Sequence, residues 1–566
     1  MRLLTAGVIP LVVLVSACVA PAQQSQSGGD ASAQARMSVP KVLTIAEKRE
    51  PEILAGYPNA GGSPRGAGIE VDMAHNQLVV SNDDNVWVPQ LATEQISVER
   101  GTWRVNSDGT METTWRLRPN VRWHDGAPFT SADLLFTYTV SKDPALPNRW
   151  GRALEAMESA SAPDPLTFVI RWSKIYVAAD EAPALGPLPR HLVEDLFLAD
   201  KERFRNSPPL TSEFIGLGPY RLVKYEPGSH AEFAPFDGYY LGRPPLDTVI
   251  VRYVLDGNAM MASILSGVVD IIMPPGIDIE GSLEIKRRWE GTGNIVRADL
   301  TDDVRILRLQ QNQGLAKPAN GFPMRAVRQA FYHALDRQGL TEVMTHGQAP
   351  AVDSWFPPFH PQRAEVDPFV PRYPYDLNRA RQLLAEVGWT RGADGVLVHQ
   401  TTGDRFETEM WADTQIGTEK EVTIIADQWK AVGAAVGVRS ITAAQTRDRS
   451  FQAQFPFAIT GEPNWLETAT QFHHGQERAT QENNWTRRNI SGYANPRFDA
   501  IADRLAVTVE PRERLPLHQQ LLQEGMGDVA FMPLYWSVQP LVMVKGVKGP
   551  QRGLTAGWNF YQWDRE

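Results

Sequence analysis

Strand-like runs alternate with helix signals along the whole chain after residue 40, and no linker-like stretch separates them. The clearest strand-like runs are short, β-branched or aromatic, and bounded by Gly, Pro or Asp. They lie at residues 43–46, 167–172, 220–225, 248–255 and 541–544. Because both element types recur from end to end, the pattern predicts mixed α/β lobes between which the chain crosses more than once, rather than independent domains.

Several helices have recognisable starts and stops. Thr130 is expected to cap a helix that begins at Ser131, with Asp133 in its acidic first turn. Asp376 is expected to cap a second helix that stops at Gly388. A third helix is indicated by one apolar face, made of Val327, Ala330, Phe331, Ala334 and Leu335.

Two more helices are predicted further along the chain. Thr418 and Glu421 have the spacing of a capping box, and Gly433 is a plausible end for the helix they would open. Asn495 and Pro496 have the pattern of a cap followed by a first-turn proline.

The N-terminus has the pattern of a targeting signal. Arg2 precedes the apolar run Leu3–Ala17, which is too short to cross a bilayer as a helix. Val-Ser-Ala-Cys at 15–18 resembles the bacterial lipobox, in which the cysteine carries lipid. We therefore expect a signal peptide at 1–17, and lipid attachment at Cys18 with a flexible tether at 18–40. An ordinary secretion signal with an incidental cysteine is the alternative.

Composition excludes several classes of protein. The chain has 566 residues, 42% hydrophobic and 22% charged, as in folded soluble proteins. Its net charge of −10 gives no basic footprint for nucleic acid or for an anionic membrane. Because Cys18 is the single cysteine, no disulfide within the chain and no cysteine metal centre can form.

Signatures of catalysis are missing from the sequence. It contains no G-x-S-x-G elbow, no phosphate loop and no H-E-x-x-H. The adjacent histidines at 473–474 are a poor chelate, and the Asp pairs at 83–84 and 302–303 are typical of turns and caps. We therefore expect no enzyme activity, no catalytic residue, no metal and no cofactor.

Tryptophans supply the first candidates for a binding site. Several of the 16 occur in loop-like places, namely Trp87, Trp355, Trp411, Trp465 and Trp536. Each of these rings either belongs to the core or forms part of a ligand-binding surface between lobes.

Residues 117–133 carry the most specific motif in the chain. They read Leu-Arg-Pro-Asn-Val-Arg-Trp-His-Asp-Gly-Ala-Pro-Phe-Thr-Ser-Ala-Asp: a strand end, a tight turn and a capped helix. This stretch resembles the signature of the extracellular solute-binding proteins of family 5, the peptide and nickel receptors of ABC importers. Further similar stretches follow in the family's order, at 218–229, 236–244, 327–337, 380–389 and 533–536.

The resemblance implies a two-lobed, periplasmic-binding-protein-like α/β fold of the large three-domain (class C, type 2) kind. Its first lobe would comprise residues 41–70, 219–300 and 533–566. An extra domain would occupy 71–218, and the second lobe 301–532. Ligand would bind in a cleft between the lobes, which close over it by a hinge motion.

The resemblance also implies a function and partners. The chain would be a monomeric, lipid-anchored extracytoplasmic receptor, in the periplasm or at the cell surface, which passes a peptide or similar small organic solute to ABC permease subunits with a cytoplasmic ATPase. The alternatives are a sensory receptor of the same fold and a secreted glycan-binding hydrolase, which would need two carboxylates about 5–10 Å apart.

One departure from the family's pattern concerns the ligand. Peptide-binding members carry an aspartate for the peptide ammonium in the stretch that corresponds to Phe457–Glu467, and that aspartate is absent here. Glu462 either replaces it or is a solvated loop acid. A cleft that is rich in tryptophan and poor in aspartate would also suit a sugar or an opine-like solute. The full set of expected ligand contacts is Trp87, Trp355, Trp411, Asp413, Thr414, Gln415, Glu462, Asn464, Trp465 and Trp536.

Overall fold

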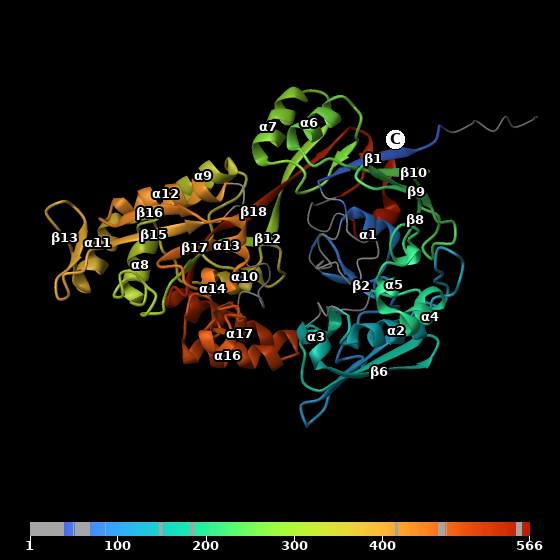
Figure 1. Cartoon of the computed structure of the whole chain (residues 1–566), viewed down its shortest axis with the longest axis horizontal. Coiled ribbons are helices and arrows are strands. Elements are labelled where there is room, and N and C mark those ends of the chain that lie inside the picture. Colours follow the sequence, from blue (N-terminus) through green and yellow to red (C-terminus); the bar gives the residue numbers. More distant parts are fainter. Residues whose placement is uncertain are drawn as a thin grey trace, which may run out of the picture. The chain divides into compact units, whose positions relative to one another are not determined.

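The computed structural model describes residues 39–48, 50, 68–84, 86–146, 151–181, 186–413, 417–461, 470, 472–550 and 557–566. The chain divides into two units, Met1–Val39 and Pro40–Glu566. The second unit contains every helix and strand of the described residues. Figure 1 shows these elements coloured along the chain.

One large sheet forms the centre of Pro40–Glu566. Its ten strands lie in the spatial order β16 (Ala435–Ser440), β15 (Glu407–Ala412), β17 (Ala458–Gly461), β12 (Ile295–Leu309), β18 (Phe531–Met543), β11 (Ile271–Ile272), β1 (Val42–Glu47), β10 (Thr248–Tyr253), β9 (His230–Pro235) and β8 (Tyr220–Glu226). Some neighbours, such as β12 and β18 or β1 and β10, are far apart in sequence, so the chain crosses more than once between the two halves of the sheet, as predicted.

The long antiparallel pair β12 and β18 joins the two halves (Figure 1). At one end of the pair, Val542 and Met543 of β18 also pair with β11. At the other end, residues Ile306–Leu309 of β12 pair with β17. We call the half with β1 and β8 to β11 lobe I, and the half with β15 to β17 lobe II.

The parallel strands of the two lobes run toward each other. In lobe I, β1 runs parallel to β10 and β11. In lobe II, β15 runs parallel to β16 and β17. Since β11 and β17 are each antiparallel to a different member of the antiparallel pair β12 and β18, the carboxyl ends of the two parallel sets point toward each other.

Helices cover the sheet in both lobes. Lobe I carries α1 (Ile69–Ala74), α6 (Gly257–Leu265) and α7 (Ile279–Arg288), with η6 (Phe560–Gln562) and the ribbon β19 (Val547–Lys548) and β20 (Asp564–Arg565) near the C-terminus. Its apolar core collects β1, β10 and β11 residues such as Leu43, Val249 and Ile271.

Lobe II has the larger core. Around it lie α8 (Arg325–His333), α9 (Arg337–Thr345), α10 (Arg363–Val366), η3 (Asp367–Phe369), α11 (Leu377–Glu386), β13 (Trp389–Arg391), β14 (Leu397–His399), α12 (Thr418–Lys430), α13 (Ala443–Arg447), α14 (Arg449–Gln452), η4 (Gly475–Glu477), η5 (Gln481–Asn483), α16 (Pro496–Val507) and α17 (Pro511–Gly527). Aromatic rings interlock inside it, with Phe322 stacked on Phe457 at 4.1 Å and Trp429 against Phe331 at 5.1 Å.

A separate four-stranded sheet is built from residues within 71–218. Its order is β4 (Trp103–Val105), β5 (Met111–Arg116), β7 (Thr167–Trp172) and β6 (Met157–Asp164). Beside it lie β2 (Val79–Ser81), β3 (Trp87–Pro89), α2 (Ser131–Lys142), α3 (Gly151–Ala156), η1 (Ala179–Glu181), α4 (Arg190–Ala199), α5 (Lys201–Arg205) and η2 (Pro208–Leu210).

Core clusters show how these parts are joined. One cluster holds only residues between Leu78 and Leu217, together with partly buried side chains packed against it. Phe136, Val193 and Phe204 belong instead to the core that contains Leu43 and Ile271 of lobe I. Helices α2, α4 and α5 therefore attach the 71–218 segment to lobe I through shared apolar packing.

Local signals placed most of the predicted helices correctly. The Thr130 amide donates to Asp133 Oδ2 at 2.8 Å in a capping box at the start of α2. Asp376 caps α11, which ends before the left-handed Gly388. Asn495 caps α16, with Pro496 in the first turn. The tight turn of the 117–133 motif is also present, since the Gly126 amide donates to the Trp123 carbonyl at 2.8 Å.

The capping box predicted for Thr418 and Glu421 is wrong. Gly417 precedes α12 with a left-handed φ of 86°, and no side chain caps the helix. Glu421 is fully buried and accepts hydrogen bonds from Arg305 and Tyr535. The carboxylate of Glu421 pairs with Arg305 of β12 and therefore does not accept a hydrogen bond from the backbone at the start of α12. The predicted strand at 541–544 is the end of the much longer β18.

Candidate functional site

The carboxyl ends of the parallel strands define the candidate site. Those of β1, β10 and β11 face those of β15, β16 and β17 along the β12–β18 pair. In open α/β sheets, ligands bind beyond the carboxyl ends of strands, at the point where the strand order reverses. We call this place the interlobe region. Residues 297–305 of β12 span it, about 30 Å at roughly 3.3 Å per residue.

Lobe I contributes acids and tyrosines to the interlobe region. Glu47, the last residue of β1, accepts a hydrogen bond from the Ile69 amide at 3.3 Å. The Tyr225 hydroxyl donates to Glu50 at 2.5 Å, and the Gly228 amide donates to the same carboxylate at 3.0 Å.

Glu70 is the most unusual of these acids. Its side chain is 0% exposed, and among the described residues no group completes a hydrogen bond to either carboxylate oxygen. Burial raises the pKa of Glu70 to about 7, with smaller contributions from the charges of Asp72 and Glu50. The Tyr253 hydroxyl is near enough to oppose this rise, yet it completes no hydrogen bond of its own. A carboxyl group of this kind titrates near neutral pH.

Lobe II contributes a buried charged network at its edge of the interlobe region. Arg305 of β12 forms an ion pair with Glu421 of α12, and the Tyr535 hydroxyl of β18 donates to the same carboxylate at 2.5 Å. Both charged side chains are almost completely buried. The network ties α12 to the two strands that join the lobes, next to the bulge in their pairing between Leu300 and Val304.

The predicted contacts fall into three groups. Trp411 and Asp413 lie at the carboxyl end of β15, on the interlobe edge of lobe II. The Trp411 ring is 4% exposed, stacks on Phe451 at 4.5 Å, and donates from Nε1 to Glu409 at 2.9 Å. Asp413 is half-buried beyond the strand end. Trp411 also belongs to a small buried apolar cluster with Ile441, Phe455 and Ile459. Contact of Trp411 and Asp413 with ligand stays a prediction.

Two other tryptophans are packed in the core of lobe II, and a third packs against the core of the 71–218 segment. Trp355 is 2% exposed and lies 4.8 Å from the ring of Phe531, while Trp536 is 1% exposed on β18. Both belong to the apolar core of lobe II. Trp87 of β3 is half-buried against the core of the 71–218 segment. Thr414, Gln415, Glu462, Asn464, Trp465 and the lipidation candidate Cys18 lie outside the described residues.

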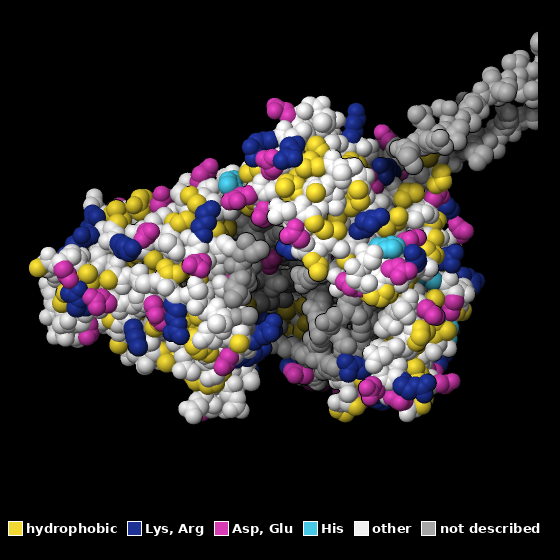
Figure 2. Space-filling model, turned by 45° about the horizontal axis from the view of Figure 1, so that its top comes forward, with side chains coloured by type: hydrophobic (Ala, Val, Ile, Leu, Met, Phe, Trp, Pro, Cys, Tyr) yellow, Lys and Arg dark blue, Asp and Glu magenta, His cyan; other side chains and the backbone are white. Residues whose placement is uncertain are grey.

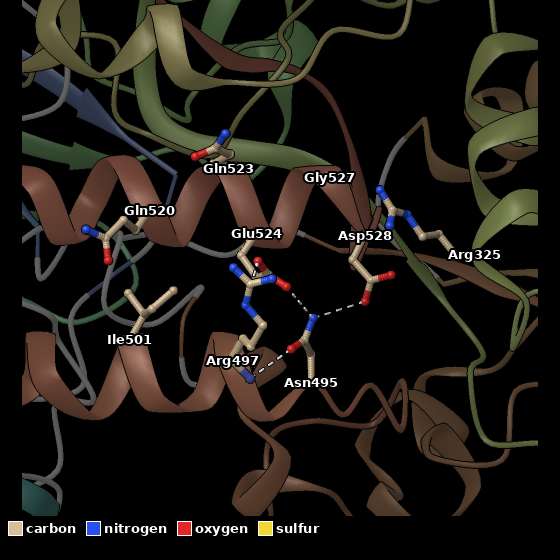
Figure 3. A pocket seen from close by; sticks show the side chains of 9 residues that line it. All are labelled: Arg325, Asn495, Arg497, Ile501, Gln520, Gln523, Glu524, Gly527 and Asp528. Atoms are coloured by element: carbon tan, nitrogen blue, oxygen red, sulfur yellow. Dashed lines mark hydrogen bonds and ion pairs between the residues drawn. The ribbon is translucent and has the colours of Figure 1, made fainter.

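Two polar cavities lie at the opposite end of the lobe II half-sheet. Both are lined by Asp528, which precedes β18, and the larger one is also lined by Gln311, which follows β12. Their volumes are about 510 and 660 Å³. The smaller one runs between α16 and α17 (Figure 3) and is lined by Arg325, Asn495, Arg497, Ile501, Gln520, Gln523, Glu524, Gly527 and Asp528.

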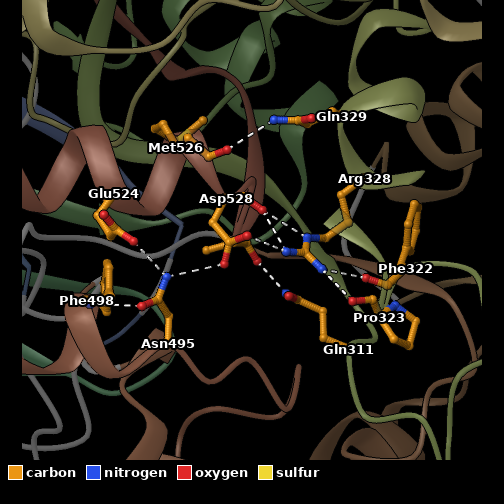
Figure 4. Close-up of polar contacts among 12 residues, drawn as sticks. Gln311, Phe322, Pro323, Arg328, Gln329, Asn495, Phe498, Glu524, Met526 and Asp528 are labelled. Atoms are coloured by element: carbon orange, nitrogen blue, oxygen red, sulfur yellow. Dashed lines mark hydrogen bonds and ion pairs between the residues drawn. The ribbon is translucent and has the colours of Figure 1, made fainter. Parts of the chain in front are cut away.

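Polar groups around these cavities largely satisfy one another (Figure 4). Arg328 donates to Asp528 Oδ1 at 2.8 Å, and the Asn495 amide donates to Glu524 at 3.0 Å. Asn495 also accepts from the Arg497 and Phe498 amides as the cap of α16. We therefore assign this network to the joining of α8, α16 and α17, and not to ligand binding.

Three features of the interlobe region were missed from the sequence: the buried network around Arg305, the unpaired Glu70, and Arg308. The sequence signal for two of these features is a charged residue within an apolar stretch, as with Arg305 and Arg308 in Val304–Leu309. Such charges in a strand indicate buried polar contacts. Among the described residues, no group of three or more His, Cys, Asp or Glu could hold a metal ion. The described helices include none long and apolar enough to span a bilayer.

Comparisons with known proteins agree with this architecture. Curated relatives include the oligopeptide-binding protein AppA of Bacillus subtilis, 23% identical over 483 residues that cover 81% of each chain. The heme-binding protein A of Haemophilus influenzae is 22% identical over 478 residues, covering 79% of this chain and 80% of that protein. The crystal structure of NikZ from Campylobacter jejuni in complex with Ni(L-His) aligns with a TM-score of 0.69 and 21% identity, over 93% of this chain and all of that one.

A family model assigns the chain more directly. The model described as bacterial extracellular solute-binding proteins, family 5 Middle, matches residues 86–483. This match includes the 117–133 motif and most of lobe II, and the two-lobed α/β fold is the one shared with the solved relatives. The chain belongs to the bacterial extracellular solute-binding proteins of family 5.

Proposed function

We propose that this chain is the extracytoplasmic solute-binding receptor of an ABC importer, and that it captures a peptide or a similar small organic solute between its lobes. The observation that carries the proposal is the meeting of two sets of parallel-strand carboxyl ends along β12 and β18. An oligopeptide-binding relative that covers most of the chain supports the peptide class, while a heme-binding relative shows that the family's ligands vary.

Opening and closing of the lobes would make capture reversible. The lobes are joined by β12 and β18, whose pairing is irregular between Leu300 and Val304 and between Arg305 and Ile306. Irregular pairing weakens the ladder locally and lets strands bend. Closure about this point would bury the solute, so that polar groups at the strand ends must match those of the solute. The proposed activity is binding and release, with no chemistry on the solute.

Delivery requires partners outside this chain. We propose that the closed, loaded receptor docks on ABC permease subunits, which are powered by a cytoplasmic ATPase, and that the receptor itself acts as a monomer. A lipid on Cys18 would keep the receptor at the membrane, with residues 19–40 as a spacer rich in Gln, Ser and Gly.

Native mass spectrometry of residues 19–566, purified gently from cells grown in rich medium, tests the proposed function. A ladder of adducts that differ by amino-acid residue masses supports a permissive peptide receptor. A single discrete adduct that is not a peptide keeps the receptor function but contradicts the peptide class. A protein that carries no adduct, and whose thermal unfolding shifts with no peptide pool or cell extract, contradicts solute capture altogether.

Replacing Cys18 with serine is expected to move the protein from the membrane fraction to the soluble extracytoplasmic fraction, because serine provides no thiol for the lipid. Immunoblots of separated fractions measure this change, and a Ser16→Ala variant is the control because it keeps the cysteine. Continued membrane attachment of the Cys18→Ser protein would contradict the lipid anchor.

Replacing Trp465 with alanine is expected to weaken solute binding by at least 10-fold while the melting temperature changes little, because an aromatic ring that contacts solute contributes area and stacking. Calorimetric titration with the solute found by mass spectrometry measures the effect. Trp485→Ala, at a half-buried position of the same lobe, is the control. If both variants bind like the parent protein, Trp465 does not line the site.

A further inference from the structure

Arg308 lies on β12, opposite Ile459 of β17 and Phe531 of β18. Its side chain extends along the sheet toward the carboxyl end of β17. A Cβ atom built on Gly461 would lie 2.9–3.0 Å from Nε, Cζ and Nη2 of Arg308, so the guanidinium rests directly on this glycine. Gly461 pairs with Ile306, two residues nearer the interlobe region than Arg308 itself. The positive charge is therefore carried toward the proposed binding site.

The guanidinium of Arg308 has no carboxylate partner among the described residues. Its Nε atom is buried and makes no hydrogen bond. The Phe472 ring covers the group, with its centroid 4.5 Å from Cζ. Three other arginines of lobe II that are buried or half-buried differ in this respect, since each pairs with an acid: Arg305 with Glu421, Arg328 with Asp528, and Arg337 with Asp353.

Arg308 as a whole is half-buried, but its Nε atom is enclosed. An enclosed donor of a charged group that has no partner among the described residues is costly, and such a group in a protein usually has a function. Burial, together with the neighbouring charge of Arg305, lowers the pKa of Arg308 to about 10. The group therefore stays protonated at neutral pH. It retains the planar fork of N–H donors that binds a carboxylate through two parallel hydrogen bonds.

We infer that Arg308 receives an anionic group of the solute, and that the receptor is selective for organic carboxylates, including the free C-terminal carboxylate of a peptide. This inference rests on the proposed function, because it places the contact in the same interlobe site.

Calorimetric titration of adduct-free protein (residues 19–566) tests this inference with four probes: trialanine, its C-terminal amide, its N-acetyl derivative and glutarate. Trialanine and the N-acetyl derivative should bind at least 10-fold more tightly than the amide, because only the free carboxylate pairs with Arg308. Arg308→Gln should bind the acid and the amide equally, and Arg308→Lys should keep part of the preference. Arg379→Gln is the control, since Arg379 is exposed on α11, away from the interlobe region, and has Glu386 at 3.9 Å as its partner.

Several outcomes separate this inference from the proposed function. If the peptides fail to bind but glutarate binds in a way that depends on Arg308, the peptide class is wrong and the carboxylate site stands. If the wild-type protein binds acid and amide equally, if Arg308→Gln keeps the preference, or if no probe that bears a carboxylate binds, the inference is overturned.

Thermal unfolding without solute gives an independent measure. Arg308→Met should raise the melting temperature, because it replaces a half-buried charge that has no carboxylate partner among the described residues with an apolar side chain of similar length. A purely structural role for Arg308 predicts the reverse: a lower melting temperature and an unchanged preference for acid over amide.

Discussion

Replacing Glu421 with alanine is expected to lower the free energy of unfolding by about 3–5 kcal/mol, because the change removes one partner of a buried ion pair. Both side chains of this ion pair are nearly inaccessible to solvent, and the hydrogen bond from the Tyr535 hydroxyl to Glu421 is lost in the same change. Urea unfolding followed by tryptophan fluorescence measures the loss.

Two variants show whether the loss comes from the buried charge. Glu419→Ala removes an exposed acid from the same first turn of α12 and should cost less than about 1 kcal/mol. Arg305→Met combined with Glu421→Leu removes both charges and should recover most of the stability, because apolar replacements of buried ion pairs are often neutral or stabilising. Equal losses for Glu421→Ala and the double variant would contradict the explanation.

The second large effect is a pH-dependent stabilisation by Glu70→Gln. The pKa of Glu70 rises from 4.5 to about 7 in the folded chain, chiefly because the side chain is buried. The folded state therefore holds the proton more tightly than the unfolded state. The carboxyl group imposes no cost below about pH 4.5, and its cost grows as the pH rises to about 7 and stays constant above that. At 1.36 kcal/mol per pKa unit, the full cost is roughly 3 kcal/mol.

Glutamine cannot ionise, so the stability of Glu70→Gln relative to the parent should increase by up to about 3 kcal/mol between pH 5 and pH 8. The comparison of two pH values cancels any constant effect of the amide on packing. Urea unfolding at both pH values measures the difference, with the exposed Glu213→Gln as the control. A Glu70→Gln difference that is the same at pH 5 and pH 8 would show that Glu70 titrates normally.

The helices predicted from sequence were those with local signals. Asp133, Asp376 and Asn495 act on backbone amides a few residues away, so nearby sequence contains all the information about these caps. The capping box at Thr418 failed although it had the same kind of pattern. There, Arg305 competed for the carboxylate of Glu421 from 116 residues away.

The candidate site was predictable in outline only. The family resemblance indicated binding between two lobes, with Trp411 and Asp413 among the ligand contacts. The structure places both residues at the carboxyl end of β15, and their contact with ligand stays a prediction. Tryptophans alone were a weaker guide, because the loop-like surroundings of Trp355 and Trp536 in sequence did not reveal that both rings pack in the core of lobe II.

The sequence by itself determined the secondary structure elements with local caps, the tight turn at Gly126, the two-lobed α/β class and the family, since each depends on residues close together or on a long specific motif. Only the tertiary structure decided which charges are paired. It pairs Glu421 with Arg305, buries Glu70 without a hydrogen-bond donor among the described residues, and places the Arg308 guanidinium over Gly461. These contacts depend on strand order and register between segments more than a hundred residues apart. The free energy of a buried charge depends on its surroundings in space and not on its neighbours in the chain.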